Sequence, residues 1–160
     1  MPRRIFKMDK QIQQTLENSF LNIMQAIDRA YEEFAKAIDM TYISMIILDE
    51  IYAHPEGCTQ KQICEAVHYP KQTVNLSIKA FWENGYVELR ELSADRRNKA
   101  VYLTKKGLAY AKKTVGQLEK IDRTAAAALT PEQQEMLVLL TRIYGEAFCD
   151  GVRNAIKKGK

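Results

Sequence analysis

The stretch of sequence that decides the fold spans Tyr69–Thr104 and reads YPKQTVNLSIKAFWENGYVELRELSADRRNKAVYLT. Its first part predicts a helix, because Val74, Ile78 and Phe81 recur at steps of four and three and therefore share one face. Gly85 follows the last of these periodic residues, at the place where a glycine lets a helix end without a steric penalty. The opposite, exposed face is left to Lys71, Gln72, Asn75 and Lys79.

Two strands are predicted after this helix. Apolar and polar residues alternate from Tyr86 to Glu91, and the alternation resumes from Lys99 to Leu103. Between them, residues 93–98 are polar and basic, and we expect them to form the tip of a hairpin. A helix that leads into a basic-tipped hairpin is typical of a winged helix-turn-helix. A surface helix of an all-α domain would show the same helical periodicity, so the periodicity alone leaves both interpretations open.

The distribution of charge favours the winged helix. From Tyr69 to Lys106 the sequence contains eight basic and four acidic residues, a net charge of +4. The whole chain has the same excess, with 24 Lys and Arg against 20 Asp and Glu, so the remainder is formally neutral. A positive charge confined to one segment suits a polyanion, because neutralising phosphates releases condensed counterions.

The residues before this stretch complete a helix-turn-helix. Thr41 is predicted to cap a helix over Tyr42–Ala53, and Thr59 with Gln62 forms a capping-box pattern that opens a short helix through about Val67. The short helix is followed closely by the helix that begins after Tyr69. In this arrangement the second helix enters the major groove of DNA and the first crosses the backbone.

Long amphipathic helices are predicted on both sides. Apolar residues recur at steps of three and four from Ile12 to Ile38. After the hairpin, one helix is predicted from Thr104 to about Ala128, and Thr130 with Pro131 marks the start of a last helix. Such helices must bury their apolar stripes against the chain's own core or against a second copy. We expect a second copy, because both ends of the chain offer such a helix.

The hairpin resembles the wing of the MarR family of transcriptional regulators. The family motif is Asp, any residue, Arg, five residues and Leu-Thr, and its positions are occupied here by Asp95, Arg97, Leu103 and Thr104. The segments PKQTV and FWENG are similar to the start and the end of the family's recognition helix. Leu76 departs from the family, since a polar or basic residue is common at its position.

The resemblance implies a mainly α fold with a small β-hairpin wing, namely a winged helix-turn-helix with N- and C-terminal dimerisation helices. Residues 41–104 would form the DNA-binding domain, and residues 1–40 and 105–160 the helical dimerisation region of a homodimer. The implied function is sequence-specific binding of double-stranded DNA by a transcriptional regulator, a repressor of a pseudo-palindromic operator that a small-molecule effector releases.

The predicted DNA contacts follow from groove geometry. Side chains at the start of the recognition helix meet base edges, where Gln and Asn can pair with adenine and Lys with guanine. Arg97 is expected to enter the minor groove, with Asp95 orienting it as the resemblance implies. Arg96 and Lys99 would contact phosphates, or would simply be solvated at the hairpin tip. The full set of predicted contacts is Thr59, Gln60, Lys71, Gln72, Thr73, Asn75, Lys79, Arg96, Arg97 and Lys99.

Small-molecule and metal sites have weaker signals. Tyr31, Phe34 and Tyr42 are candidates to line the effector crevice that the resemblance implies, although aromatic residues at helical spacing are more often core. Three cysteines without a CxxC motif indicate reduced thiols, and Cys64 is expected to pack in the core. With two histidines and no clustered ligands, neither a metal nor another cofactor is expected.

Other classes of protein are disfavoured. No nucleophile elbow, phosphate-binding loop or paired-carboxylate pattern occurs, so we do not expect an enzyme. No apolar run approaches the roughly 18 residues of a membrane span, and we expect a cytoplasmic protein. The alternative is a winged-helix module that contacts only proteins, for which exposed apolar residues on the recognition helix, here Leu76 and Trp82, would be the signature.

Overall fold

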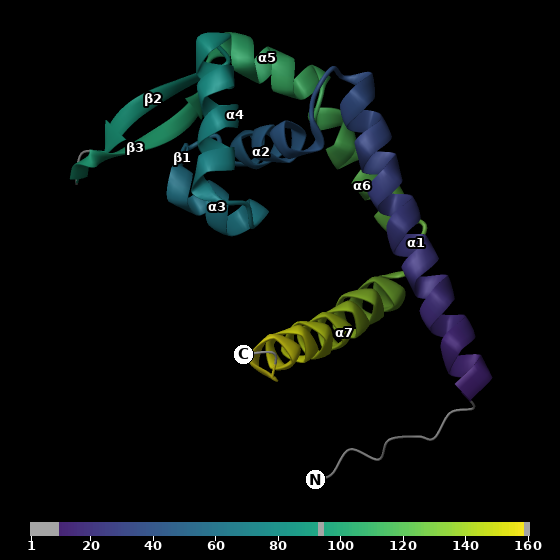
Figure 1. The fold of residues 1–160 in the computed structure, drawn as a ribbon. Helices are drawn as coiled ribbons and strands as arrows, with labels where there is room; N and C mark the ends of the chain where they lie inside the picture. Colours follow the sequence, from purple (N-terminus) through teal and green to yellow (C-terminus); the bar gives the residue numbers. More distant parts are fainter. Residues whose placement is uncertain (1–9, 93–94, 159–160) are drawn as a thin grey trace. The chain divides into compact units, whose positions relative to one another are not determined.

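The computed structural model describes residues 10–92 and 95–158, with only the backbone at Ile12, Gln13, Leu92 and 95–98. The fold is mainly helical with a small antiparallel sheet, as the sequence predicts (Figure 1). The chain forms two compact units, Met1–Gly116 and Gln117–Lys160. The elements are α1 (Lys10–Ala37), α2 (Tyr42–Ala53), β1 (Cys58–Thr59), α3 (Gln60–Val67), α4 (Lys71–Glu83), β2 (Val87–Leu92), β3 (Asp95–Leu103), α5 (Lys105–Lys113), α6 (Gly116–Ala127) and α7 (Pro131–Lys158).

Helix α2 lies at the centre of the first unit. It contacts α1, α3, α4, α5 and β3, and its side chains Met45, Ile47 and Leu48 are fully buried. The predicted cap is confirmed, because the Thr41 hydroxyl accepts a hydrogen bond from the Ser44 backbone N–H at 3.1 Å. The apolar sequence of α2 is therefore the core against which the other elements of this unit pack.

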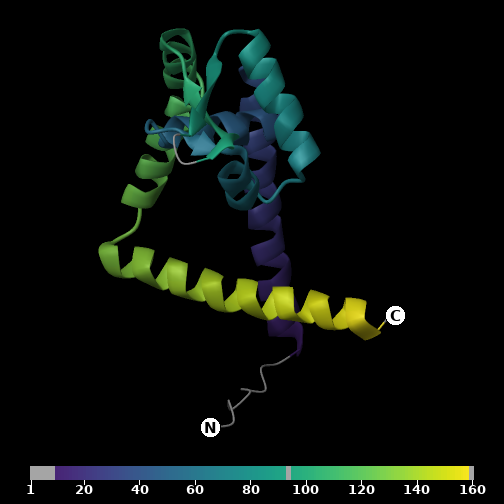
Figure 2. The same ribbon diagram turned by 90° about the vertical axis from the view of Figure 1, so that its left-hand side faces the viewer.

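Helices α3 and α4 form the predicted helix-turn-helix. The capping box at the start of α3 is confirmed: the Thr59 N–H donates to Gln62 Oε1 at 2.8 Å, and the Gln62 N–H donates to Thr59 Oγ1 at 3.2 Å. On α4, the apolar face formed by Val74, Ile78 and Phe81 is buried, as its spacing predicts. Figure 2 shows α4 with one long side facing away from the other elements of the first unit.

The sheet is larger than predicted. Its strand order is β1-β3-β2, with both pairs antiparallel, and β2 and β3 extend as a hairpin (Figure 1). Strand β1 was not predicted, because two residues cannot show alternation. The expected hairpin tip over residues 93–98 is wrong in extent, since β3 already begins at Asp95. The pairing of β2 with β3 continues past a register shift between Glu91 and Leu92. The polar side chains there do not prevent it, because the hydrogen bonds between strands use only backbone groups.

The carboxyl end of α4 has the hydrogen bonds of a Schellman motif. Gly85 has a φ of +69°, in the left-handed region that favours glycine. The Gly85 N–H donates to the Trp82 carbonyl at 2.9 Å, and the Tyr86 N–H donates to the Phe81 carbonyl at 2.8 Å. The helix therefore ends where the position of Gly85 predicts.

Thr104 fastens this helix end to the start of α5. Its N–H donates to the Tyr86 carbonyl at 3.0 Å, and its hydroxyl donates to the Gly85 carbonyl at 2.7 Å. The same hydroxyl caps α5 by accepting from the Gly107 N–H at 2.9 Å. One side chain thus joins the end of α4, the start of β2 and α5.

The prediction of a single helix from Thr104 to Ala128 is wrong. Helix α5 ends at Lys113 and α6 begins at Gly116. Between them Thr114 has φ −102° and ψ −91°, and its hydroxyl donates to the Tyr110 carbonyl at 2.8 Å. A β-branched residue that bonds back to the preceding turn, followed within two positions by a glycine, disfavours a continuous helix.

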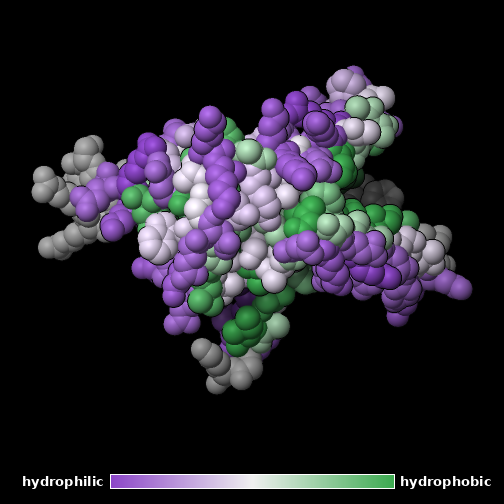
Figure 3. Space-filling view, turned by 90° about the horizontal axis from the view of Figure 1, so that it is seen from above, coloured by the Kyte–Doolittle hydropathy of each residue, from purple (hydrophilic) through white to green (hydrophobic). Residues whose placement is uncertain are grey.

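The long helices α1 and α7 carry exposed apolar side chains. Helix α7 begins with the predicted capping box, in which the Thr130 N–H donates to Gln133 Oε1 at 2.9 Å. Figure 3 shows apolar, green side chains at the surface among hydrophilic, purple ones. None of the helices within the described ranges is long and apolar enough to cross a membrane. The exposed apolar residues on the two helices include Leu16, Ile23 and Ile27 of α1 and Leu137, Leu140, Ile143, Phe148 and Val152 of α7.

The contact between α5 and the Tyr86 backbone makes a testable prediction about Gly107. A Cβ at Gly107 would lie 2.6 Å from the Tyr86 carbonyl carbon, a backbone atom that cannot rotate away. We expect Gly107→Ala to lower the free energy of unfolding by about 1–3 kcal/mol or more. In Gly116→Ala, the added Cβ makes contacts of 3.4–3.5 Å, which are ordinary, and this control should retain wild-type stability. Urea unfolding of both variants is the measurement, and equal midpoints would contradict the prediction.

Candidate nucleic-acid interface

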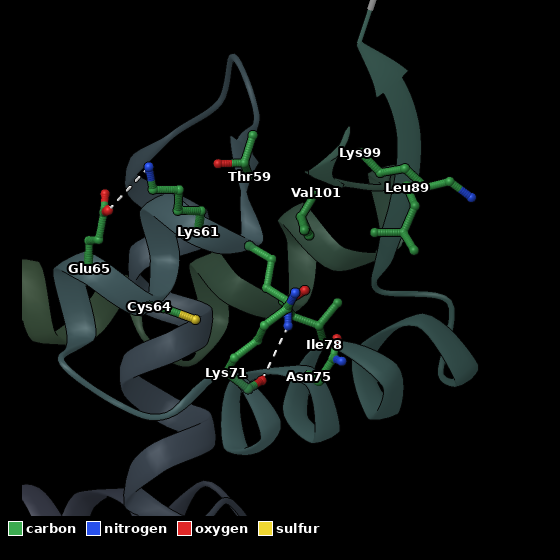
Figure 4. Close-up of a pocket in the computed structure, with 11 residues that line it drawn as sticks. Thr59, Lys61, Cys64, Glu65, Lys71, Asn75, Ile78, Leu89, Lys99 and Val101 are labelled. Atoms are coloured by element: carbon green, nitrogen blue, oxygen red, sulfur yellow. Dashed lines mark hydrogen bonds and ion pairs between the residues drawn. The ribbon is translucent and has the colours of Figure 1, made fainter. Parts of the chain in front are cut away.

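A groove of about 750 Å³ lies between α3, α4 and the wing (Figure 4). Its floor is apolar and includes Ile78, Leu89 and Val101. Lysines line it from three elements: Lys61 on α3, Lys71 on α4 and Lys99 on β3; the remaining lining residues are Thr59, Gln60, Cys64, Glu65 and Asn75. The helix-turn-helix and the hairpin thus line one groove together, with three lysines and one glutamate along it.

The outer face of α4 is arranged as the sequence predicts. Lys71, Gln72, Asn75 and Lys79 are exposed, whereas Thr73 is half-buried. Lys79 forms an ion pair with Glu83 at 3.7 Å, but the two side chains are 69% and 55% exposed. An exposed pair of this kind contributes little to stability, so Lys79 can exchange Glu83 for an external anion at small cost.

Thr59 and Gln60, both predicted to contact DNA, also form hydrogen bonds within the helix-turn-helix. The Thr59 hydroxyl takes part in the capping box, and its O–H donates to Gln62 Oε1 at 2.8 Å. Gln60 Nε2 donates to the Lys71 carbonyl at 3.2 Å and so links the start of α3 to the start of α4. Both side chains are half-buried. Thr59 thus caps α3, whereas Gln60 joins α3 to α4.

The wing supplies a further cation in Lys99, which is exposed and lines the groove. Arg90 is instead engaged within the wing, where it pairs with Glu88 and lies 4.4 Å from the centre of the Tyr102 ring. The predictions for Asp95, Arg96 and Arg97 concern side chains outside the described residues. Only their backbone is described, in β3.

Lys61 is a groove residue that was not predicted from the sequence. This lysine is 84% exposed, and its ion pair with Glu65 at 3.8 Å is correspondingly weak. Lys71 and Lys99 form no ion pair with a residue in the described ranges. Lys61 could have been found from its place directly after Gln60, on the exposed side of the predicted short helix.

The three cysteines are free and differ in their surroundings. Burial, and then the negative charges of Glu50 and Glu56, raise the pKa of the Cys58 thiol to about 11. Cys64 was expected in the core but is half-buried and lines the groove, because α3 turns this side chain toward the gap beside α4. Among the described residues, no three His, Cys, Asp or Glu side chains gather where they could hold a metal ion.

The three aromatic candidates for effector binding lie at the junction of α1 and α2. Tyr31 and Tyr42 have ring centroids 6.2 Å apart and an interplanar angle of 58°. Phe34, like both tyrosines, is half-buried. Burial is the first cause that raises the pKa of Tyr42, followed by Tyr69, so this phenol stays protonated near neutral pH.

Comparison with known proteins agrees with this geometry. Residues 38–98, from the end of α1 to the hairpin, match the sequence model of the MarR family. AbsC, a MarR family transcriptional regulator from Streptomyces coelicolor, superposes with a TM-score of 0.70 at 18% identity, over 90% of this chain and 99% of its own.

Two further structures share the fold. NMB1585, a MarR family regulator from Neisseria meningitidis, has a TM-score of 0.68 at 22% identity, over 89% of this chain and 97% of its own. The S. aureus MepR–DNA complex has a TM-score of 0.63 at 21% identity, over 79% of this chain and 97% of its own. The helix-turn-helix and wing thus match the MarR family model, and the fold along most of the chain is that of the MarR family winged-helix regulators.

Proposed function

We propose that this chain is a sequence-specific regulator of transcription that binds double-stranded DNA as a homodimeric repressor of a pseudo-palindromic operator. The observation that carries the proposal is the shared surface of α4 and the wing, on which Lys61, Lys71 and Lys99 surround one groove. A related fold bound to DNA, the MepR complex, supports duplex DNA as the partner. Apart from Leu76 and Trp82, the exposed face of α4 is mostly polar and basic, which favours DNA over a protein partner.

The proposed contacts divide between bases and phosphates. Lys71, Gln72, Thr73 and Asn75 lie in the first turns of α4, the end of a recognition helix that meets base edges. Phosphates would be neutralised by Lys79, Lys99 and Arg96. The start of α3, with Thr59 and Gln60, would contact the phosphate backbone of the DNA. Arg97, held by Asp95, would enter the minor groove.

The central test is selection of bound duplexes from a random pool, followed by affinity measurements at several salt concentrations. We expect a two-fold-symmetric site to be enriched. In a plot of the logarithm of the binding constant against the logarithm of the salt concentration, each lysine at a phosphate contributes about 0.9 to the steepness of the slope. A dimer carries Lys99 twice, so Lys99→Ala should make the slope shallower by about 2. Arg97→Ala should weaken the preference for A·T pairs beside the half-sites.

Lys120→Ala is the matched control, because Lys120 is an exposed lysine of α6 outside the groove and should leave the slope unchanged. If a site is enriched but Lys99→Ala shows the same salt dependence as wild type, then Lys99 of the wing does not contact a phosphate. If no sequence is enriched and Arg97→Ala binds like wild type, the proposal fails, and a winged-helix module for protein contacts becomes the better interpretation.

The proposed homodimer rests on α1 and α7, whose exposed apolar stripes need a partner helix. Leu140 is 56% exposed within one chain. Because a carboxylate in an apolar interface is costly, Leu140→Glu should raise the dissociation constant of the dimer by about a hundredfold or more in sedimentation equilibrium. Arg142→Gln is the control, because it also lowers the net charge by one. Arg142 lies about 200° around the helix from Leu140, so this variant should leave dimerisation intact. Equal dissociation constants for the two variants would place the dimer contact elsewhere.

Release of DNA by a small aromatic effector is the last part of the proposal, supported by the half-buried Tyr31, Phe34 and Tyr42. Phenolic compounds would be screened for release of the selected duplex from wild type. An active compound should require about 2–10 times the concentration with Tyr42→Phe, since one hydrogen bond is lost. Tyr110→Phe retains the stack on Tyr86 and serves as the control. An equal response of both variants would remove Tyr42 from the effector site.

A further inference from the structure

Leu76 is an apolar side chain in a polar surface. It is 70% exposed, the highest exposed fraction of any large apolar side chain in the described part of the chain. It lies in the middle of α4 and lines a shallow hollow with Gln72, Asn75 and Lys79. The exposed apolar residues of α7 recur along a stripe that a partner helix can cover, whereas Leu76 has polar neighbours on every side of this hollow.

The position of Leu76 on α4 decides what it would meet in a complex. The buried face of this helix is formed by Val74, Ser77, Ile78 and Phe81. Leu76 is one turn from Gln72 and lies on the opposite side, so it points outward together with the residues proposed to read bases. If α4 lies in the major groove, as the proposed function requires, Leu76 faces base edges.

The chemistry of the major groove offers a leucine one favourable contact. Base edges there present N7, O6 and O4 acceptors, amino donors and a single apolar group, the 5-methyl of thymine. Against the polar edges a leucine would displace water from groups that it cannot hydrogen-bond, which is unfavourable. Against a methyl group it buries apolar surface on both sides.

We propose that Leu76 reads the 5-methyl group of a thymine and so requires a T·A pair at one position in each half-site of the operator. This inference rests on the proposed function and assigns part of its sequence specificity. Cytosine lacks the methyl group and presents an amino donor instead, so Leu76 discriminates between the two pyrimidines.

The test replaces each thymine of the selected duplex in turn by deoxyuridine, which removes the methyl group and keeps the base pair. The probes are the unmodified duplex and the deoxyuridine duplexes, bound by the full chain. Loss of one buried methyl contact corresponds to about a fourfold weaker affinity, so one position in each half-site should show this effect. Replacement in both half-sites together should weaken binding by about fifteenfold.

The variant Leu76→Ala should bind the unmodified duplex about as weakly as wild type binds the doubly substituted one, and should not respond to deoxyuridine. Leucine and alanine are both good helix formers and the site is exposed, so the variant should melt like wild type. Trp82→Ala is the matched control: it removes another exposed apolar side chain of α4, 55% exposed, and should keep the fourfold response.

Three results would overturn the inference. They are a selected half-site without thymine on either strand, no deoxyuridine position that weakens wild-type binding, or a fourfold response that persists in Leu76→Ala. Each of these leaves sequence-specific, salt-dependent DNA binding intact and so spares the proposed function. If no sequence is selected at all, both the proposed function and the inference fail.

Discussion

The surface proposed to face DNA depends on how three consecutive carbonyl groups just after α4 find hydrogen-bond donors. Lys106 Nζ donates to the Asn84 carbonyl at 2.7 Å, and Thr104 donates to the carbonyls of Gly85 and Tyr86. These carbonyls lie in the turn between α4 and β2, and the bonds satisfy groups that would otherwise need water. Because the donors come from the end of β3 and the start of α5, the same bonds fix the angle between recognition helix and wing.

Aromatic packing strengthens this junction. The rings of Tyr86 and Tyr110 are parallel, with centroids 4.2 Å apart, and Lys106 Nζ lies 4.9 Å from the centre of the Tyr86 ring. The close approach of Gly107 to the Tyr86 backbone belongs to the same arrangement. Lys106, which in the sequence is only part of a basic segment, thus donates a hydrogen bond to the residue that caps the end of α4. Its charge still contributes to the field near the groove, but its ammonium group is not free to follow a phosphate.

Much of the fold can be predicted because it is encoded locally. Thr41, Thr59 and Thr130 cap the helices that the sequence assigns to them, and Gly85 ends α4, since each signal acts within a few residues. The predictions were wrong where the local structure depends on contacts or hydrogen bonds that the sequence pattern does not show. Strand β1 exists only because β3 passes beside it. The break at Thr114 follows from hydrogen bonds that compete with the helix, which periodicity does not register.

The candidate site shows the same division. The exposure of Lys71, Gln72, Asn75 and Lys79 follows from helical periodicity alone. The link between Gln60 and the Lys71 backbone, and the place of Lys61 and Cys64 beside the groove, depend on how α3 packs against α4. The proposed roles of Asp95, Arg96 and Arg97 still rest on the wing motif, because their side chains lie outside the described residues.

Exposed apolar surface has two distinct meanings in this protein, and spacing separates them. On α1 and α7 many apolar residues are exposed along the helix, several of them spaced three or four positions apart. A helix laid alongside can cover many of them at once and bury enough surface to offset the entropy of association. Leu76 has no such neighbours, and a single leucine cannot hold a protein partner. Under the proposed function it contributes selectivity, within an interface that other groups stabilise. An isolated apolar residue such as Leu76 indicates base selectivity when the residues around it already supply the charge and the hydrogen bonds for the proposed contact with DNA.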